Sequence, residues 1–153
     1  MNQYSTSFSL LLERLDTLSS YSVHAQSSPP KVSFFQRKRH KIECKLLASS
    51  VVDVQRHAAA LIGYFEGYDA RGSFQSDFVG ADNVHDLASC LEVLDHVVGT
   101  TRVVVARFTK GDGALVKNGP TKPGPDRTLA VACAHVEGII AQLRRILGDN
   151  QEN

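Results

Sequence analysis

The chain has 153 residues, of which 42% are hydrophobic and 22% are charged, and its formal net charge at pH 7 is +1. This size and composition predict a single folded domain with one buried core. The small net charge excludes a global field that would draw the whole molecule to nucleic acid or to a membrane.

Four segments of the sequence repeat apolar residues every three or four positions. This spacing is typical of helices that bury one face, so we predict helices at approximately residues 4–22, 40–70, 82–109 and 127–147. Such helices bury their stripes most simply against one another. The sequence therefore predicts an all-α fold, an uneven four-helix bundle that forms a single domain over residues 1–153.

The predicted helices differ in length. The second helix, with about 30 residues, would be roughly 45 Å long, and the first would be much shorter. We expect the long helices to project past the short one. Apolar surface exposed on that projection would suit a partner or a second copy of the chain.

Capping residues mark the expected helix ends. Asp82 is placed to cap the third helix, and Pro125 with Asp126 to open the fourth. A glycine follows each of the last three helices, where a left-handed cap is expected. These glycines are Gly72, Gly111 and Gly148.

Two stretches allow more than one interpretation. Residues 99–108 are rich in β-branched side chains and on their own resemble a strand, but the helical spacing crosses them without interruption. We favour a continuous helix, in which Gly99 costs about 1 kcal/mol. Gly63 and Gly67 share one helix face and indicate either a close helix crossing or a softened helix end.

The loops differ in length and composition. Residues 23–36 form a Ser/Pro loop, and residues 70–81 form a shorter loop that carries two phenylalanines. Residues 109–125 contain four glycines, three prolines and several lysines. This long Gly/Pro/Lys loop precedes the last helix, and loops of that kind are usually functional or disordered.

The most informative local feature is a cluster of cations, which we call the basic junction (residues 31–45). It holds six cations and one anion, a local charge of +5 in a chain whose total is +1. Two aromatic residues precede the densest part, so phosphate contacts and base stacking are both chemically available. Lys117 and Lys122 of the long loop are auxiliary candidates. The candidate nucleic-acid-binding residues are Phe34, Phe35, Arg37, Lys38, Arg39, Lys41, Lys45, Lys117 and Lys122.

Other interpretations of the basic junction remain open. It can be a solvated helix start, because charge runs often have no further role. The phenylalanines can instead tuck under the first helix as a hydrophobic lid. The run of cations also fits a nuclear-import signal.

The histidines and cysteines give no pattern typical of a metal or catalytic site. His85, His96 and His135 fall on outward positions, and His57 flanks its stripe, so a metal site inside the bundle is not expected. No nucleophile elbow, phosphate-binding loop or dinucleotide fingerprint occurs. We expect no cofactor, and an enzyme would need a composite site built from scattered residues.

The start of the chain and its cysteines indicate an intracellular protein. The apolar run around Leu10–Leu12 meets Glu13 at once and is too short for a secretory signal. No stretch approaches the roughly 18 apolar residues of a membrane span. Cys44, Cys90 and Cys133 are odd in number and far apart, which argues against a disulfide framework. We expect a cytoplasmic or nuclear protein without membrane contact.

These observations support three functional hypotheses. The first is a non-enzymatic, self-assembling bundle that contacts nucleic acid or another polyanion through the basic junction. The second is a protein–protein adaptor or scaffold subunit, and the third is an enzyme. In size, and in the long loop before the last helix, the chain resembles the small helical-bundle coat proteins of rod-shaped RNA viruses. That resemblance is architectural, and no motif carries a residue role across.

Overall fold

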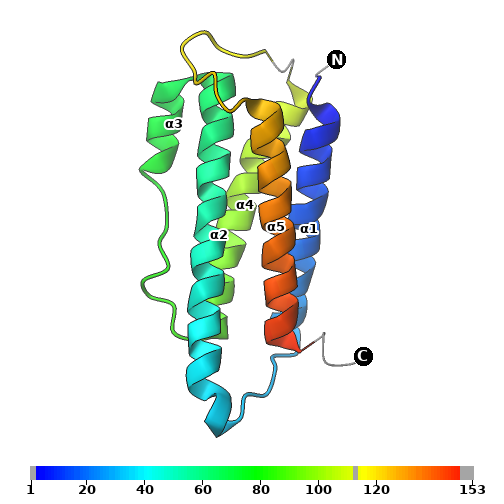
Figure 1. Cartoon of the computed structure of the whole chain (residues 1–153), viewed down its shortest axis with the longest axis vertical. Helices are drawn as coiled ribbons and strands as arrows, with labels where there is room; N and C mark the ends of the chain where they lie inside the picture. The colour runs from blue at the N-terminus through cyan, green and yellow to red at the C-terminus, as the bar shows by residue number, and fades with distance from the viewer. Residues whose placement is uncertain (1–2, 112–113, 149–153) are drawn as a thin grey trace.

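The computed structural model describes residues 3–111 and 114–148, and in this part every regular element is a helix (Figure 1). The all-α prediction is confirmed. Residues 99–108 lie inside the fourth α-helix, so their helical interpretation is also confirmed. The elements are α1 (Ser5–Ser27), the 3₁₀ turn η1 (Phe34–Gln36), α2 (Arg37–Glu66), α3 (Tyr68–Gln75), α4 (Leu87–Lys110) and α5 (Pro125–Leu147).

Helices α1, α2, α4 and α5 form a four-helix bundle. Helices α1 and α5 run in one direction, and α2 and α4 run in the other (Figure 1). Helices α4 and α5 each pack against both α1 and α2, so α1 lies diagonally opposite α2, and α4 opposite α5. The α1–α2 linker therefore crosses one end of the bundle, and the α4–α5 loop crosses the other. Helix α3 packs on α2 outside the bundle.

The apolar stripes meet in one continuous core, as their helical spacing predicts. At the end of the bundle that holds the start of α1, four aromatic rings join α1, α2 and α4. Neighbouring centroids in this cluster are 5.0–6.3 Å apart, in tilted or edge-to-face arrangements that favour aromatic pairs. The four rings belong to Tyr4, Phe8, Phe65 and Phe108.

Several helix ends differ from the prediction. Helix α2 ends at Glu66, because Gly67 has a φ of 99° that interrupts the helix, and Gly72 lies inside α3. Asp86, rather than Asp82, caps α4, because its carboxylate accepts from the Ser89 N–H at 2.8 Å. The predicted glycine cap holds at Gly148, which has the left-handed conformation.

The remaining ends also need correction. Gly111 has an extended backbone and does not form a left-handed cap. Helix α5 begins at Pro125, so Asp126 lies in its first turn and Gly124 is the capping residue. Pro125 suits this place because a first-turn N–H has no partner within the helix.

A buried glutamine holds the long connection between α2 and α4. The Gln55 side chain donates to the Val79 carbonyl at 2.9 Å and accepts from the Val79 N–H at 3.1 Å. Gln55 is only 4% exposed, so these bonds satisfy polar groups that would otherwise be buried without partners. This pair fixes the connection alongside the middle of α2.

The long loop before α5 lies against the end of α2. The Tyr64 carbonyl accepts from the Val116 N–H at 3.1 Å, and the Tyr64 hydroxyl accepts from the Gly124 N–H at 2.8 Å. Gly63 also faces this loop, since a Cβ there would lie 3.3 Å from Pro120. Together with the helix end at Gly67, this favours the softened-end interpretation of the two glycines over a close helix crossing.

The bundle is less uneven than its predicted lengths imply. Helix α1 has 23 residues and continues to Ser27, so it is not much shorter than α4 with 24. Only α2, with 30 residues, extends past its neighbours, and its first turns project from one end of the molecule (Figure 1). Within the described residues, no helix combines the length and the apolar character that crossing a bilayer requires.

Candidate nucleic-acid interface

The basic junction forms the projecting end of the molecule. Pro29 and Pro30 follow the end of α1. An extended linker then leads into η1 and directly into α2 (Figure 1). Proline lacks the N–H that a helix interior needs, so the chain leaves helical conformation here and starts a new helix beyond the bundle end. We call residues 33–45, at the start of α2, the tip.

The cations of the tip are exposed and mostly unpaired. Arg39 forms an ion pair with Glu43 at 3.1 Å, one turn further along α2. Arg37 lies over the ring of Phe34, with its guanidinium carbon 5.5 Å from the ring centroid. Within the described residues, no carboxylate lies within 4.0 Å of Arg37, Lys38, Lys41 or Lys45. Among the residues that the structure describes, only Glu43 therefore offsets the positive charge of the tip.

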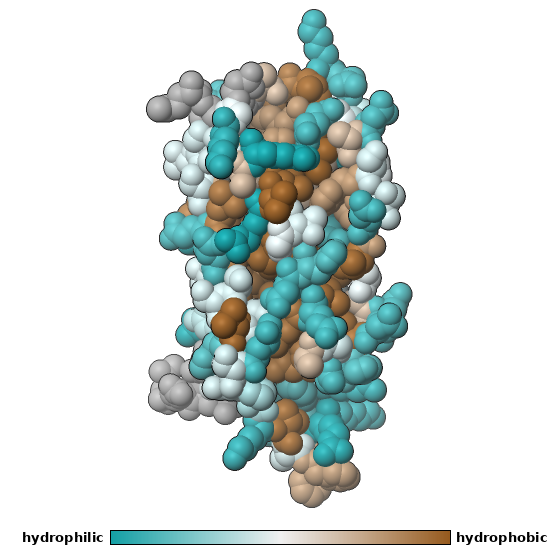
Figure 2. Space-filling view, turned by 180° about the vertical axis from the view of Figure 1, so that it is seen from behind, coloured by the Kyte–Doolittle hydropathy of each residue, from teal (hydrophilic) through white to brown (hydrophobic). Residues whose placement is uncertain are grey.

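The two phenylalanines stand in solvent. Phe34 is 75% exposed and Phe35 is 94% exposed, and their rings meet edge to face at 5.8 Å. This contradicts the hydrophobic-lid interpretation, which requires them to be covered. In the space-filling view, residues coloured as apolar form the extreme lower point of the molecule, with hydrophilic residues on both sides above it (Figure 2).

The cations at the start of α2 lie at the positive end of the helix, which is unfavourable for the fold when no anion is bound. No acidic residue lies in the first turn, and no side chain caps it. The start of a helix carries partial positive charge, so cations there repel it at roughly 0.3–1 kcal/mol each. An anion placed at the tip would relieve this repulsion. The arrangement therefore favours a negatively charged partner.

A groove of about 760 Å³ opens beside the tip, between the start of α2 and the end of α5. Lys31 and Arg39 line one side, and Arg145 lines the other, with Glu43 as the one anion among the lining residues. Sequence reasoning missed Arg145, because more than 100 residues separate it from Arg39 and only the side-by-side packing of α2 and α5 brings them together.

The structure does not bring Lys117 and Lys122 to the tip. They belong to the loop that crosses the opposite end of the bundle, where the Val116 N–H donates a hydrogen bond to the Tyr64 carbonyl. Tyr64 follows Lys41 by 23 residues in α2, so about 35 Å separates the two ends. Both lysines are exposed, but they form a separate basic element.

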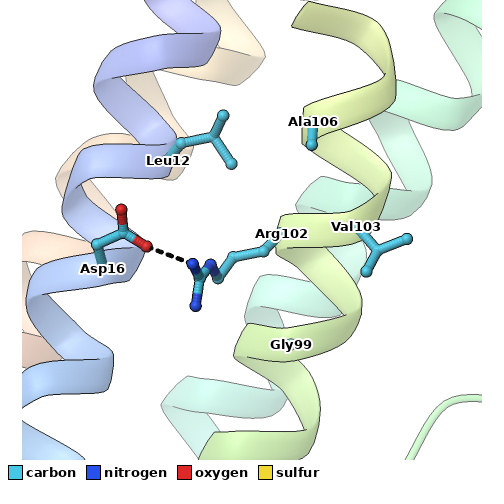
Figure 3. Close-up of a pocket in the computed structure, with 6 residues that line it drawn as sticks. All are labelled: Leu12, Asp16, Gly99, Arg102, Val103 and Ala106. Atoms are coloured by element: carbon cyan, nitrogen blue, oxygen red, sulfur yellow. Dashed lines mark ion pairs between the residues drawn. The ribbon is translucent and has the colours of Figure 1, made fainter.

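A second, apolar groove of about 450 Å³ lies between α1 and α4 (Figure 3). Arg102 of α4 donates to Asp16 of α1 at 2.8 Å and bridges the two helices at one edge. Val103 points away from α1 and is 69% exposed. The other lining residues are Leu12, Gly99 and Ala106.

Two histidines meet at the α2–α5 contact, which their predicted positions did not suggest. The rings of His57 and His135 have centroids 5.3 Å apart, and the ring of His135 is hydrogen-bonded to the Ser50 carbonyl at 2.7 Å. Burial lowers the pKa of His57, the neighbouring His135 lowers it further, and Asp53 opposes both. His135 is therefore partly buried rather than outward, as predicted from its spacing.

The three cysteines are free and buried. Burial raises the pKa of Cys44 to about 11 and that of Cys90 to about 12, so both are protonated thiols at neutral pH. Within the described residues, no three His, Cys, Asp or Glu side chains converge as metal ligands would.

Comparisons of the chain with protein-family models, with curated proteins and with solved structures found no match.

Proposed function

We propose that this protein is a non-enzymatic, self-assembling helical bundle that binds single-stranded nucleic acid through its projecting tip. One observation carries the proposal: two exposed phenylalanine rings lie beside several cations that no carboxylate of the described residues pairs, all at the end of the molecule. Cations alone would suit any polyanion. Exposed aromatic rings beside them suit a polyanion whose bases are unpaired.

The binding mechanism follows from these side chains. Arg37, Lys38 and Lys41 contact phosphates and release condensed counterions, which favours binding without regard to sequence. Phe34 and Phe35 offer faces or edges on which bases stack, at about 1–3 kcal/mol per base. The positive end of α2 adds to the attraction at the same place.

The experiment is a fluorescence-anisotropy titration with labelled single-stranded RNA and DNA of about 12 nucleotides, at several salt concentrations. Replacing Arg37, Lys38, Arg39 and Lys41 with glutamine should abolish most of the affinity and flatten its salt dependence. The matched control replaces Lys110, Lys117, Lys122 and Arg127, which make the same charge change at the opposite end. Equal losses in the two variants, or affinity of the native chain that ignores salt, would contradict the proposal.

The aromatic contribution has its own test. Phe34→Ser with Phe35→Ser should weaken binding to the single strand and leave the salt dependence nearly unchanged, since no phosphate contact is lost. Binding to a duplex of the same length should change little, because paired bases are not available for stacking. A variant that binds the single strand as well as the native chain would show that the rings have no role.

A protein partner is the second candidate, and one observation favours it. Ile42 and Leu46 lie one turn apart on α2, and both are more than half exposed beside the tip. Such a stripe can meet the apolar face of another protein. In that case the purified protein would carry no nucleic acid. Its absorbance ratio at 260 and 280 nm separates the two candidates sensitively, because the chain contains no tryptophan.

The proposed setting is intracellular, in the cytoplasm or the nucleus. The free, buried thiols fit a reducing compartment, and the exposed cations of the tip fit either binding or nuclear import. Localising the native chain and the four-glutamine variant by fluorescence microscopy would separate an import signal from a binding surface.

A further inference from the structure

The groove between the start of α2 and the end of α5 continues directly from the tip. Arg39 belongs to both, since it lies among the tip cations and also lines the groove. A strand held at the phenylalanines therefore meets this groove next. The volume of about 760 Å³ is within the range of sites that enclose a small ligand.

The charges that line the groove match a phosphodiester. Lys31, Arg39 and Arg145 supply three positive charges from the linker, α2 and α5. Among the described residues that line the groove, the one anion is Glu43, and it is already paired with Arg39. Gln36 and Gln142 add neutral donors on the two sides, and Leu46 with Ile146 supplies apolar contact. The groove thus has a positive surplus together with hydrogen-bond donors, which is the chemistry that binds phosphate and sugar.

Two adjacent arginines at the end of α5 point to different surfaces of the bundle. Arg144 turns toward α1, where its guanidinium carbon lies 6.0 Å from the ring centroid of Tyr21. Arg145 lines the groove. Both are in the last turn of α5, where a cation suits the helix dipole equally. Only their direction distinguishes them.

We infer that the α2–α5 groove is a second phosphate subsite, in which Arg145 and Lys31 hold the backbone of the strand whose bases stack on Phe34 and Phe35. This inference rests on the proposed function and adds to it a residue far from the basic junction in sequence. It also implies that strands confined to the tip bind less tightly than strands that reach the groove.

The test compares two single substitutions of equal charge in the full chain. Arg145→Gln should weaken binding of a labelled single strand of about 12 nucleotides several-fold. It should also make the negative slope of log affinity against log salt shallower by about 0.7. Arg144→Gln should leave both quantities unchanged, and Arg145→Lys should restore the slope. Thermal unfolding by circular dichroism shows whether each variant is folded.

The outcomes separate the subsite from the tip. Equal behaviour of Arg145→Gln and Arg144→Gln, with binding still lost in the four-glutamine tip variant, would overturn the subsite and leave the proposed function standing. Binding that the tip variant retains would overturn the proposed function, and the subsite with it. Loss of affinity for an acidic peptide, but not for the strand, in Arg145→Gln would assign the groove to a protein partner and overturn the inference.

Discussion

Gly119 is the residue at which a side chain would do most harm to the loop before α5. A Cβ at this position would lie 2.3 Å from the carbonyl oxygen of Gly63, inside van der Waals contact with backbone that cannot turn away. Gly138, in the middle of α5, has the opposite surroundings, because nothing lies within 4 Å of the corresponding position.

These surroundings predict opposite effects of the same substitution. Gly119→Ala should lower the free energy of unfolding by about 1–3 kcal/mol, since the loop must move off α2. Gly138→Ala should raise it by about 0.5–1 kcal/mol, since alanine favours the helix without strain. Urea denaturation followed by circular dichroism measures both. A stabilised Gly119→Ala variant would mean that the loop does not pack on Gly63 in solution.

We expect His57 to make the bundle less stable as the pH falls. Its folded pKa lies below the unfolded value of about 6.5, so protons bind the unfolded chain more readily. The contribution of His57 is therefore complete above that pH and is lost as the pH falls through about 6.5 toward the folded pKa. The partner ring of His135 strengthens this effect, and the carboxylate of Asp53 weakens it.

The expected result is that His57→Asn flattens the dependence of unfolding free energy on pH between about 7 and 5, measured relative to the native chain. His96→Asn is the matched control, because it removes an exposed histidine of α4 and leaves the contact between His57 and His135 in place. A His57→Asn variant whose slope equals that of the native chain would show that His57 is solvated in the folded state.

At the scale of elements, the cations in the first turn of α2 have opposite expected effects on the stability of the fold and on the proposed nucleic-acid binding. Lys38 repels the positive end of the helix, so Lys38→Glu should raise the free energy of unfolding by about 0.3–1 kcal/mol. The same change should weaken nucleic-acid binding and lower its salt slope by about 0.7 or more, because a phosphate contact is lost. Urea denaturation and the anisotropy titration give the two values.

The control for this prediction reverses a charge at the other kind of helix end. Lys110 lies in the last turn of α4, where a cation is favourable, so Lys110→Glu should destabilise the fold by a similar amount and leave binding unchanged. A Lys38→Glu variant that is less stable than the native chain would reveal a native partner for Lys38 and remove the argument that Lys38 destabilises the start of α2.

The four long helices were predictable because each carries an apolar stripe at the helical period, and burial of these stripes dominates the energy of the fold. Their ends were less predictable. The stripe continues through Phe65 to Tyr68, but the backbone of Gly67 turns away beside Asn118 of a loop 51 residues later. The cap of α4 was readable in principle, since Asp86 and Ser89 have capping-box spacing.

At the scale of the whole molecule, the candidate site was predictable only where it is contiguous in sequence. Phe34 to Lys45 could be identified from composition, because neighbouring residues at a helix start stay together in any fold. The separation of Lys117 and Lys122 from the tip depends on the length of α2. The approach of Arg145 depends on which helices lie diagonally opposite. The apolar spacing predicted the length of α2, but no local pattern shows which end of α2 the loop crosses or which helices are neighbours.

The proposed self-assembly requires a contact surface on the bundle. The apolar groove between α1 and α4 lies along the side of the molecule, away from the tip, so two copies joined there would leave both tips accessible (Figures 1 and 3). Val103 stands at its rim with most of its surface in water. We propose a second copy of the chain as the occupant, since clustered tips would bind one strand at several points.

If the chain self-assembles through this groove, Val103→Glu should reduce the proposed assembly to a monomer, measured by size-exclusion chromatography with light scattering after nuclease treatment. The reason is that a carboxylate buried between two apolar surfaces has no partner there and costs more than the contact gains. Val131→Glu is the matched control, because Val131 is an exposed valine on α5 outside this groove. A native chain that is monomeric without nucleic acid, or equal disruption by both substitutions, would remove the α1–α4 groove as the assembly surface and leave binding at the tip to single molecules.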